Sequence, residues 1–240
     1  MGNGVAATTV GELSVRCLYA GASMNETVMQ DLFCFDNFRP DQIITALSTH
    51  GTISLPILQE EFRLALLDEA QNSSYSAEPE TVGSGEHLVK QQAASCCIFE
   101  AESLYRTLQQ TFQTLCDEAF RDITPAPFAT PLRLTEIRLQ KYVQGSLGIT
   151  PHIDGERFRN LVCVFIIGGH GRFGVCDDRL GTNPKWIDAS PGRVIFLRAP
   201  GFLGEDKRPF HFVTDIQDER YTCGLRQRGP QIQHRIWGRE

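Results

Sequence analysis

Apolar residues in the first half of the chain recur mainly at helical spacing, every three to four positions. The pattern predicts a helix from about 40 to 49, with Pro40 at a favourable first position, and a second helix from about 56 to 71. The most regular apolar face spans about 102 to 120, so this helix should pack against a large apolar surface. Residues 72–86 are polar and contain Gly, Ser and Pro, which predicts a loop.

The pattern changes at about Leu132 to short β-like runs separated by Gly and Pro turns. Shorter runs of this kind occur earlier, at 13–18 and as a strand and turn at 31–38. The later expected strands are Leu134–Tyr142, Leu161–Ile167, Arg172–Cys176, Arg193–Leu197, Phe210–Thr214 and Arg220–Arg226. Many short, closely spaced strands favour a sandwich or jelly roll, here covered on one sheet by the helices. We therefore expect an α+β, mainly β fold in a single domain, 1–240.

Composition narrows the protein class. The chain is 41% hydrophobic and 22% charged, which is typical of a folded globular protein. It has no apolar run long enough for a membrane span and no secretory signal pattern at its start, so a cytoplasmic location is expected. None of its eight cysteines forms a Cys-x-x-Cys pair, which argues against a zinc knuckle or a redox dithiol.

Charge is distributed unevenly along the chain. Residues 1–130 carry 6 Lys/Arg against 17 Asp/Glu, whereas residues 131–240 carry 17 against 12. The mildly basic second half suits an anionic ligand. The net charge of −6 argues against a protein that binds along a nucleic-acid backbone.

The stretch TPHIDGE contains candidate metal ligands. In an extended chain His152 and Asp154 point to the same side, roughly 7 Å apart, although a lone His-x-Asp is often only a polar strand end. His211 lies on another apolar strand, where an unpaired imidazole would be costly to bury. Two histidines and one carboxylate form the facial triad that binds non-haem Fe(II) and leaves three coordination positions open.

A basic residue follows the second histidine at a fixed interval. Arg220 comes nine residues after His211, and Arg220, Thr222, Gly224 and Arg226 alternate onto one face of a predicted strand. A guanidinium held inside a barrel binds a planar carboxylate through two hydrogen bonds. A dicarboxylate that ligates iron at one end would meet Arg220 at the other.

His152, Asp154, His211 and Arg220 together resemble the motif of the Fe(II)- and 2-oxoglutarate-dependent oxygenases. The resemblance implies a double-stranded β-helix (jelly roll, cupin-like) core over 131–228, with 1–130 supplying helical support and variable loops. It also implies Fe(II) at the triad and 2-oxoglutarate as co-substrate, held by Arg220. The expected enzyme is an oxidoreductase that uses O2 and releases succinate and CO2, with ascorbate as reductant in vitro.

Three details resemble the AlkB-like branch of this family. Arg220 and Arg226 have its Arg-x5-Arg spacing, Gln140-Lys141-Tyr142 precedes the His-x-Asp motif, and Pro191–Arg198 resembles the strand before its distal histidine. Thr222, Gly224 and Gln140 depart from the branch pattern. Prolyl-hydroxylase-like members share the nine-residue interval, so the subfamily stays open. The resemblance makes Tyr142, Gln140 and Arg226 candidates for co-substrate contact; Tyr142 as a core aromatic and Arg226 as a solvated charge are the alternatives.

Candidate substrate residues lie outside the motif. Arg157, beside the His-x-Asp pair, either lines the pocket mouth or is a solvated charge. His170, flanked by glycines, suits an exposed turn or a substrate contact, with Arg172 next to it.

Three functions stay open at this point. The favoured one is hydroxylation of a small molecule or a protein side chain. The alternative is AlkB-like oxidative demethylation of alkylated nucleic acid, a partner that the acidic total does not favour. A non-catalytic ligand-binding β-barrel is the alternative from another class. No membrane partner is expected.

Overall fold

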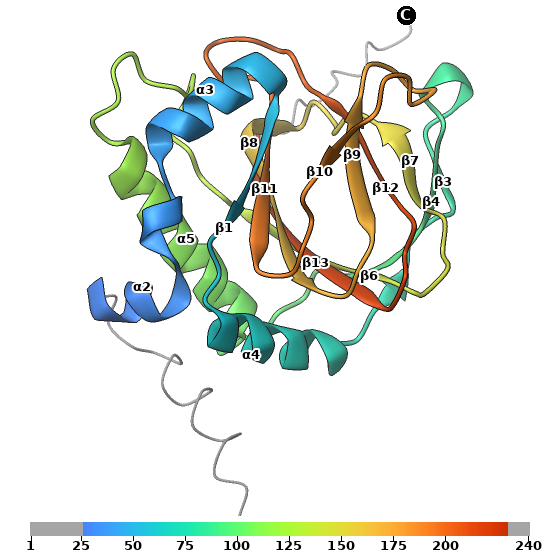
Figure 1. The fold of residues 1–240 in the computed structure, drawn as a ribbon, viewed down its shortest axis with the longest axis horizontal. Helices are drawn as coiled ribbons and strands as arrows, with labels where there is room; N and C mark the ends of the chain where they lie inside the picture. Colours follow the sequence, from blue (N-terminus) through green and yellow to red (C-terminus); the bar gives the residue numbers. More distant parts are fainter. Residues whose placement is uncertain (1–25, 230–240) are drawn as a thin grey trace, which may run out of the picture.

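The computed structural model describes residues 26–229, and their strands form two antiparallel sheets that face each other (Figure 1). The larger sheet has the order β1-β11-β8-β13-β6-β5-β2, and the smaller has the order β10-β9-β12-β7-β4-β3. The strands are β1 (Thr52–Pro56), β2 (Ser76–Ala77), β3 (Thr81–Val82), β4 (Val89–Gln92), β5 (Ala94–Cys96), β6 (Glu136–Tyr142), β7 (Gly148–His152), β8 (Phe158–Gly168), β9 (Arg172–Cys176), β10 (Lys185–Ile187), β11 (Arg193–Arg198), β12 (Phe210–Thr214) and β13 (Arg220–Arg228). From β6 onward the chain passes repeatedly from one sheet to the other, which is the jelly-roll connectivity that the pattern predicted.

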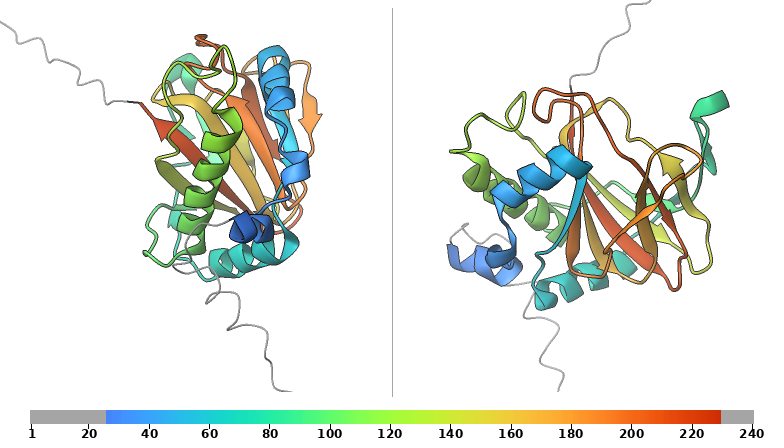
Figure 2. Two further views of the ribbon diagram at one scale, coloured as in Figure 1. Left: turned by 90° about the vertical axis from the view of Figure 1, so that its left-hand side faces the viewer. Right: turned by 45° about the horizontal axis from the view of Figure 1, so that its top comes forward.

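The helices cover the outer face of the larger sheet, as Figure 2 shows from the side. They are α2 (Glu26–Leu32), α3 (Pro40–His50), α4 (Glu60–Gln71) and α5 (Leu104–Phe120), with 3-10 turns η1 (Phe35–Asn37) and η2 (Gly85–His87). Helix α3 packs on β1 and β11, α4 on β8, and α5 on β6. Ser103 caps α5 by accepting from the backbone N–H of Tyr105 at 3.2 Å.

Two apolar cores lie on the two faces of the larger sheet. Alternate residues of β8 point to opposite sides, so Phe165 belongs to the helix-side core and Ile166 to the core between the sheets. Phe112 of α5 meets Phe165 edge-on, with ring centroids 4.9 Å apart. The second core surrounds the polar residues that the two sheets enclose, and it includes Phe158, Phe173 and Val213.

The helical predictions hold in part. The helices expected at 40–49 and 102–120 are confirmed as α3 and α5. The helix expected from 56 begins only at Glu60, because Pro56 ends β1, which pairs with β11, and Leu58 forms an isolated bridge with Phe33. The first four residues of the expected helix are therefore the end of a strand and a short connection.

Two local predictions were wrong. The segment 31–38, expected as a strand and turn, contains the end of α2, one isolated bridge from Phe33 to Leu58, and η1. The segment 72–86, expected as a loop, contains β2, β3 and part of η2. Both strands are only two residues long, so no alternating pattern could mark them. The strand expected at 13–18 lies outside the described residues.

The mainly β fold and its jelly-roll arrangement are confirmed. Residues before 130 supply the four α-helices named above and also strands β1 to β5, which extend both sheets. Across residues 26–229, no helix is long and apolar enough to cross a membrane.

Candidate active site

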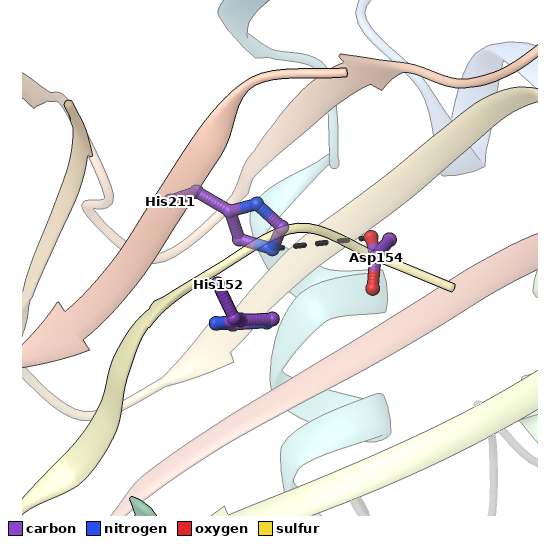
Figure 3. A group of neighbouring side chains, drawn as sticks. All are labelled: His152, Asp154 and His211. Carbon is purple, nitrogen blue, oxygen red and sulfur yellow. Dashed lines mark ion pairs between the residues drawn. The ribbon is translucent and has the colours of Figure 1, made fainter. Parts of the chain in front are cut away.

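The two sheets enclose a cluster of three possible metal ligands. His152 ends β7, Asp154 follows it, and His211 lies directly opposite His152 on β12 (Figure 3). One ligand atom from each residue lies within 4.8 Å of the others, and His211 Nε2 is 3.9 Å from Asp154 Oδ2. Antiparallel pairing of β7 with β12 therefore brings together ligands that are 59 positions apart in the sequence.

Backbone carbonyls orient both imidazoles. His152 Nδ1 lies 2.9 Å from the carbonyl oxygen of Thr150, and His211 Nδ1 lies 3.2 Å from that of Pro209. A carbonyl oxygen only accepts, so each Nδ1 donates to it, and Nε2 is the nitrogen that the neutral form of each imidazole offers to a metal ion. Phe173 stacks on the His211 ring at 5.8 Å and fixes its plane.

The protonation states suit a divalent cation. Burial, together with the nearby His211, lowers the pKa of His152 to about 4. Burial acts to raise the pKa of the Asp154 carboxyl, but the charges of His211 and Arg226 outweigh it and lower that pKa. Near neutral pH His152 is thus neutral and Asp154 ionised, which is the form that binds a metal ion. Arg208 fixes the loop by donating to the Asp154 backbone carbonyl at 2.7 Å.

Arg220 faces the same interior and has no partner. Its side chain is 0% exposed, yet Nε, Nη1 and Nη2 all lack a hydrogen-bond acceptor among the described residues. Burial lowers its pKa, but a guanidinium stays protonated in proteins. Buried polar groups are nearly always satisfied, so a buried cation with three open donor atoms fits a planar anion from outside the chain.

The triad and Arg220 line one cavity of about 450 Å³. In the register of β6 and β13, Tyr142 lies opposite Arg220, and Gln140 lies opposite Thr222. All four residues line the cavity, and the Arg220 guanidinium lies 5.7 Å from the centre of the Tyr142 ring. The arrangement places a metal-ligand cluster and a cation without a hydrogen-bond partner among the described residues at two positions of one cavity.

Arg226 lines the same cavity, and its charge lowers the pKa of Asp154. Its Nη1 is 3.2 Å from Glu136 Oε1, and its guanidinium is 4.8 Å from the centre of the Phe158 ring. A Cβ at position 224 would lie 3.2 Å from Arg226 Nη2, so glycine leaves this side chain the space it occupies. The alternation on β13 predicted this common face for Arg220, Thr222 and Arg226.

Several cavity residues were missed from sequence. Arg138 on β6 pairs with Glu78 at 2.5 Å, and alternation with Gln140 and Tyr142 could have identified Arg138. His87 and Arg179 also line the cavity. They come from η2 and from the β9–β10 connection, and no local pattern connects these segments with the triad.

The three candidate substrate residues lie in two different hollows of the protein. Arg157 lines the cavity with the triad. His170 and Arg172 line a different hollow. His170 is exposed, with Nδ1 2.6 Å from Asp218 Oδ2, and the Arg172 guanidinium lies 3.5 Å from the centre of a Trp186 ring. The structure therefore does not bring His170 and Arg172 to the triad.

Comparisons with known proteins give a likeness in structure alone. No protein-family model matches the sequence, and a search of curated proteins finds no significant match. A prolyl hydroxylase from Trichoplax adhaerens, solved with a hypoxia inducible factor peptide fragment, is similar with a TM-score of 0.61 at 14% identity, covering 85% of this chain and 93% of that chain. A Pseudomonas putida prolyl-4-hydroxylase is similar with a TM-score of 0.56 at 14% identity, over 79% and 99% of the two chains.

A third similar structure is not described as a prolyl hydroxylase. OsALKBH1 has a TM-score of 0.51 at 13% identity, over 74% of this chain and 98% of that chain. These identities are too low to carry a substrate from one protein to another. The chain has the double-stranded β-helix fold of the 2-oxoglutarate- and Fe(II)-dependent oxygenases, which confirms at the level of the fold the resemblance that the motifs indicated.

Proposed function

We propose that the protein is an Fe(II)- and 2-oxoglutarate-dependent dioxygenase that hydroxylates a small molecule or a protein side chain. The observation that carries the proposal is Arg220. It is fully buried, all three of its nitrogens lack partners among the described residues, and it lines the same cavity as the His152, Asp154 and His211 cluster. A dicarboxylate that binds metal at one end satisfies both features at once.

Each residue has a defined task in this proposal. His152, Asp154 and His211 would hold Fe(II) on one face and leave three positions open. Arg220 would bind the far carboxylate of 2-oxoglutarate through its open donors, with Tyr142 and Gln140 beside it. Bound iron and 2-oxoglutarate would supply oxidation of the substrate by O2, coupled to decarboxylation of 2-oxoglutarate to succinate. Apolar residues of the core between the sheets, among them Phe173 and Val213, line this space.

Succinate formation tests the proposal. The purified protein is incubated with Fe(II), ascorbate, 2-oxoglutarate and air, and succinate is measured with and without metal. We expect metal-dependent succinate from the wild type, even as slow uncoupled turnover, and at least ten-fold less from His152→Ala and Arg220→Met. Arg159→Gln removes a charge outside the cavity and should match the wild type.

Failure of the wild type to bind metal and 2-oxoglutarate would contradict the enzyme proposal and favour a ligand-binding barrel.

Oxidative demethylation of alkylated nucleic acid is the second candidate. It is supported by the place of Arg226 beside Asp154 and by the likeness in fold to OsALKBH1. Salt-dependent binding of a methylated oligonucleotide, stronger than that of the unmethylated strand, would favour it. Equal and negligible binding of both strands at low salt would exclude it.

A further inference from the structure

Two cavity arginines have no role in holding the metal or 2-oxoglutarate. Among the basic residues that line the cavity, Arg220 is assigned to the co-substrate, Arg138 pairs with Glu78, and Arg226 pairs with Glu136. Arg157 and Arg179 remain. Neither has an ion-pair partner within residues 26–229.

The acidic neighbour of Arg157 is engaged elsewhere. Glu156 pairs with Arg208, with Oε1 3.3 Å from Nη2, and Arg208 also holds the Asp154 backbone. The Arg157 guanidinium lies 4.8 Å from the centre of the Phe158 ring, a contact that leaves its in-plane N–H donors open. Arg157 is exposed, so it lines the cavity from its solvent side.

Arg179 reaches the cavity from a loop with its own internal bonds. Asp178 accepts from the backbone N–H groups of Leu180 and Thr182 at 2.9 and 3.1 Å, and from the Thr182 hydroxyl at 2.8 Å. Asp177 accepts from Asn183 at 2.7 Å. The two acids nearest in sequence therefore stabilise the loop and leave the Arg179 guanidinium without a carboxylate partner.

The Arg179 side chain presents an unused donor. Its Nη2 donates to His87 Nδ1 at 3.3 Å, whereas Nη1 is buried with no hydrogen-bond partner in the described chain. Since Nδ1 of His87 accepts, a neutral His87 carries its proton on Nε2 and adds another N–H donor to the cavity lining. Arg157 and Arg179 thus add to the cavity lining two guanidinium groups that have no direct ion pair within the described residues, although the charge of Arg157 also lowers the pKa of Asp154.

One segment that borders the cavity carries acidic residues outside it. The segment that supplies Val82, Gly83 and His87 to the cavity also carries exposed Glu80 and Glu86. A polyanion lying across this rim would meet those carboxylates, whereas a small anion inside the cavity would not. The volume of about 450 Å³, shared with 2-oxoglutarate, also fits a small molecule.

We infer that the substrate is a small anionic molecule whose carboxylate or phosphate group is bound by Arg157 and Arg179. This inference rests on the proposed function and names the substrate class for the same cavity. Arg138 and Glu78 neutralise each other, so the positive charge of the two free arginines sets the selectivity for an oxyanion over a neutral or cationic group.

Matched probes in the presence of Mn(II) test this inference. The paramagnetic ion occupies the triad, 2-oxoglutarate is present at saturation, and NMR relaxation reports probes that bind close to the metal. The carboxylate pair is 3-phenylpropionate and 3-phenylpropionamide, and the phosphate pair is phenethyl phosphate and phenethyl alcohol. Phenethylamine is the cationic probe. The two anionic arms distinguish a carboxylate from a phosphate substrate.

We expect at least one anionic probe to show Mn(II)-dependent relaxation with a dissociation constant at least ten-fold lower than its neutral counterpart. The double variant Arg157→Gln/Arg179→Gln should lose at least ten-fold in affinity for that probe and keep its affinity for 2-oxoglutarate. Arg159→Gln, which removes a nearby charge outside the cavity, should leave both affinities unchanged. The double variant Arg157→Lys/Arg179→Lys should keep part of the preference for the anionic probe.

The inference is overturned if neutral or cationic probes bind as tightly as anionic ones, if no anionic probe relaxes near the metal, or if the double variant keeps the preference. In each of these outcomes Mn(II) and 2-oxoglutarate still bind, so the proposed function stands. Failure of the wild type to bind Mn(II) or 2-oxoglutarate overturns the proposed function, and the inference with it.

Discussion

Replacing Arg220 with methionine is expected to have opposite effects on stability and on co-substrate binding. The side chain is fully buried, and none of its three nitrogens has an acceptor within the described residues. In the protein without ligand this charge is therefore a cost to folding, and methionine fills a similar volume without charge. With 2-oxoglutarate present, the same guanidinium becomes the binding partner that methionine cannot replace.

The burial of Arg220 sets the expected changes in the free energy of unfolding and in 2-oxoglutarate affinity. Leaving a buried donor unsatisfied costs about 1–3 kcal/mol, so Arg220→Met should raise the free energy of unfolding of the ligand-free protein by about 1–3 kcal/mol. For a chain of this size that raises Tm by about 2–12 °C. Losing a charge-paired carboxylate contact costs about 2–5 kcal/mol, which weakens 2-oxoglutarate binding about 30- to 5000-fold.

Arg63 provides the matched control. It is also buried, at 8% exposure, but it pairs with Glu60 through two hydrogen bonds and donates to the Ile167 carbonyl at 2.7 Å. Arg63→Met should therefore lower the free energy of unfolding by about 1–3 kcal/mol and leave 2-oxoglutarate affinity unchanged.

Urea denaturation of the metal-free variants and calorimetric titration of 2-oxoglutarate in the presence of Mn(II) measure both quantities. If Arg220→Met destabilises the ligand-free protein as Arg63→Met does, and binds 2-oxoglutarate normally, Arg220 is a structural residue and the reasoning fails.

Three further predictions concern the triad and the smaller sheet. His211→Ala should weaken Mn(II) binding by at least about 100-fold in a calorimetric titration while the far-UV circular dichroism stays unchanged, since it removes a ligand and leaves the backbone pairing of β12 in place; unchanged affinity would contradict the triad. Gly174→Ala should lower the free energy of unfolding by about 1–3 kcal/mol in urea, because the new Cβ would lie 2.5 Å from the Phe212 ring; a neutral effect would contradict the packing. Folding lowers the pKa of His152 from 6.5 to about 4, so the unfolded chain binds more protons between these pH values. The metal-free protein should therefore lose stability as pH falls from about 6.5 to about 4, and His152→Gln should reduce that loss. If the variant and the wild type lose stability identically over this range, the buried His152 is not the cause.

Local patterns were enough for the parts of the site that lie within one strand. Arg220, Thr222 and Arg226 were placed on one face by alternation along β13, and His152 and Asp154 were paired by their spacing. These predictions depend only on the period of an extended chain, which tertiary contacts do not alter. The same alternation along β6 places Arg138 in the cavity with Gln140 and Tyr142.

The parts of the fold and of the site that local patterns did not predict depend on contacts between segments far apart in the sequence. Strand β5 has three residues and exists because it pairs with β6, with Cys96 opposite Leu139. Arg179 and His87 reach the cavity from segments 92 positions apart, and neither segment has a periodic pattern. His170 was a candidate substrate residue because of its residue type and its flanking glycines. Its partner is Asp218 on the surface, and it lines a hollow separate from the cavity of the triad.

The central claim is that one cavity holds a metal at the triad and a dicarboxylate between that metal and Arg220. A crystal structure of the protein with Mn(II) and 2-oxoglutarate tests it most directly. The account predicts Mn(II) bound by Nε2 of His152, Nε2 of His211 and the Asp154 carboxylate, with the far carboxylate of 2-oxoglutarate within hydrogen-bond distance of Arg220. A cavity without metal, or 2-oxoglutarate bound away from Arg220 with its guanidinium still unpaired, would contradict it.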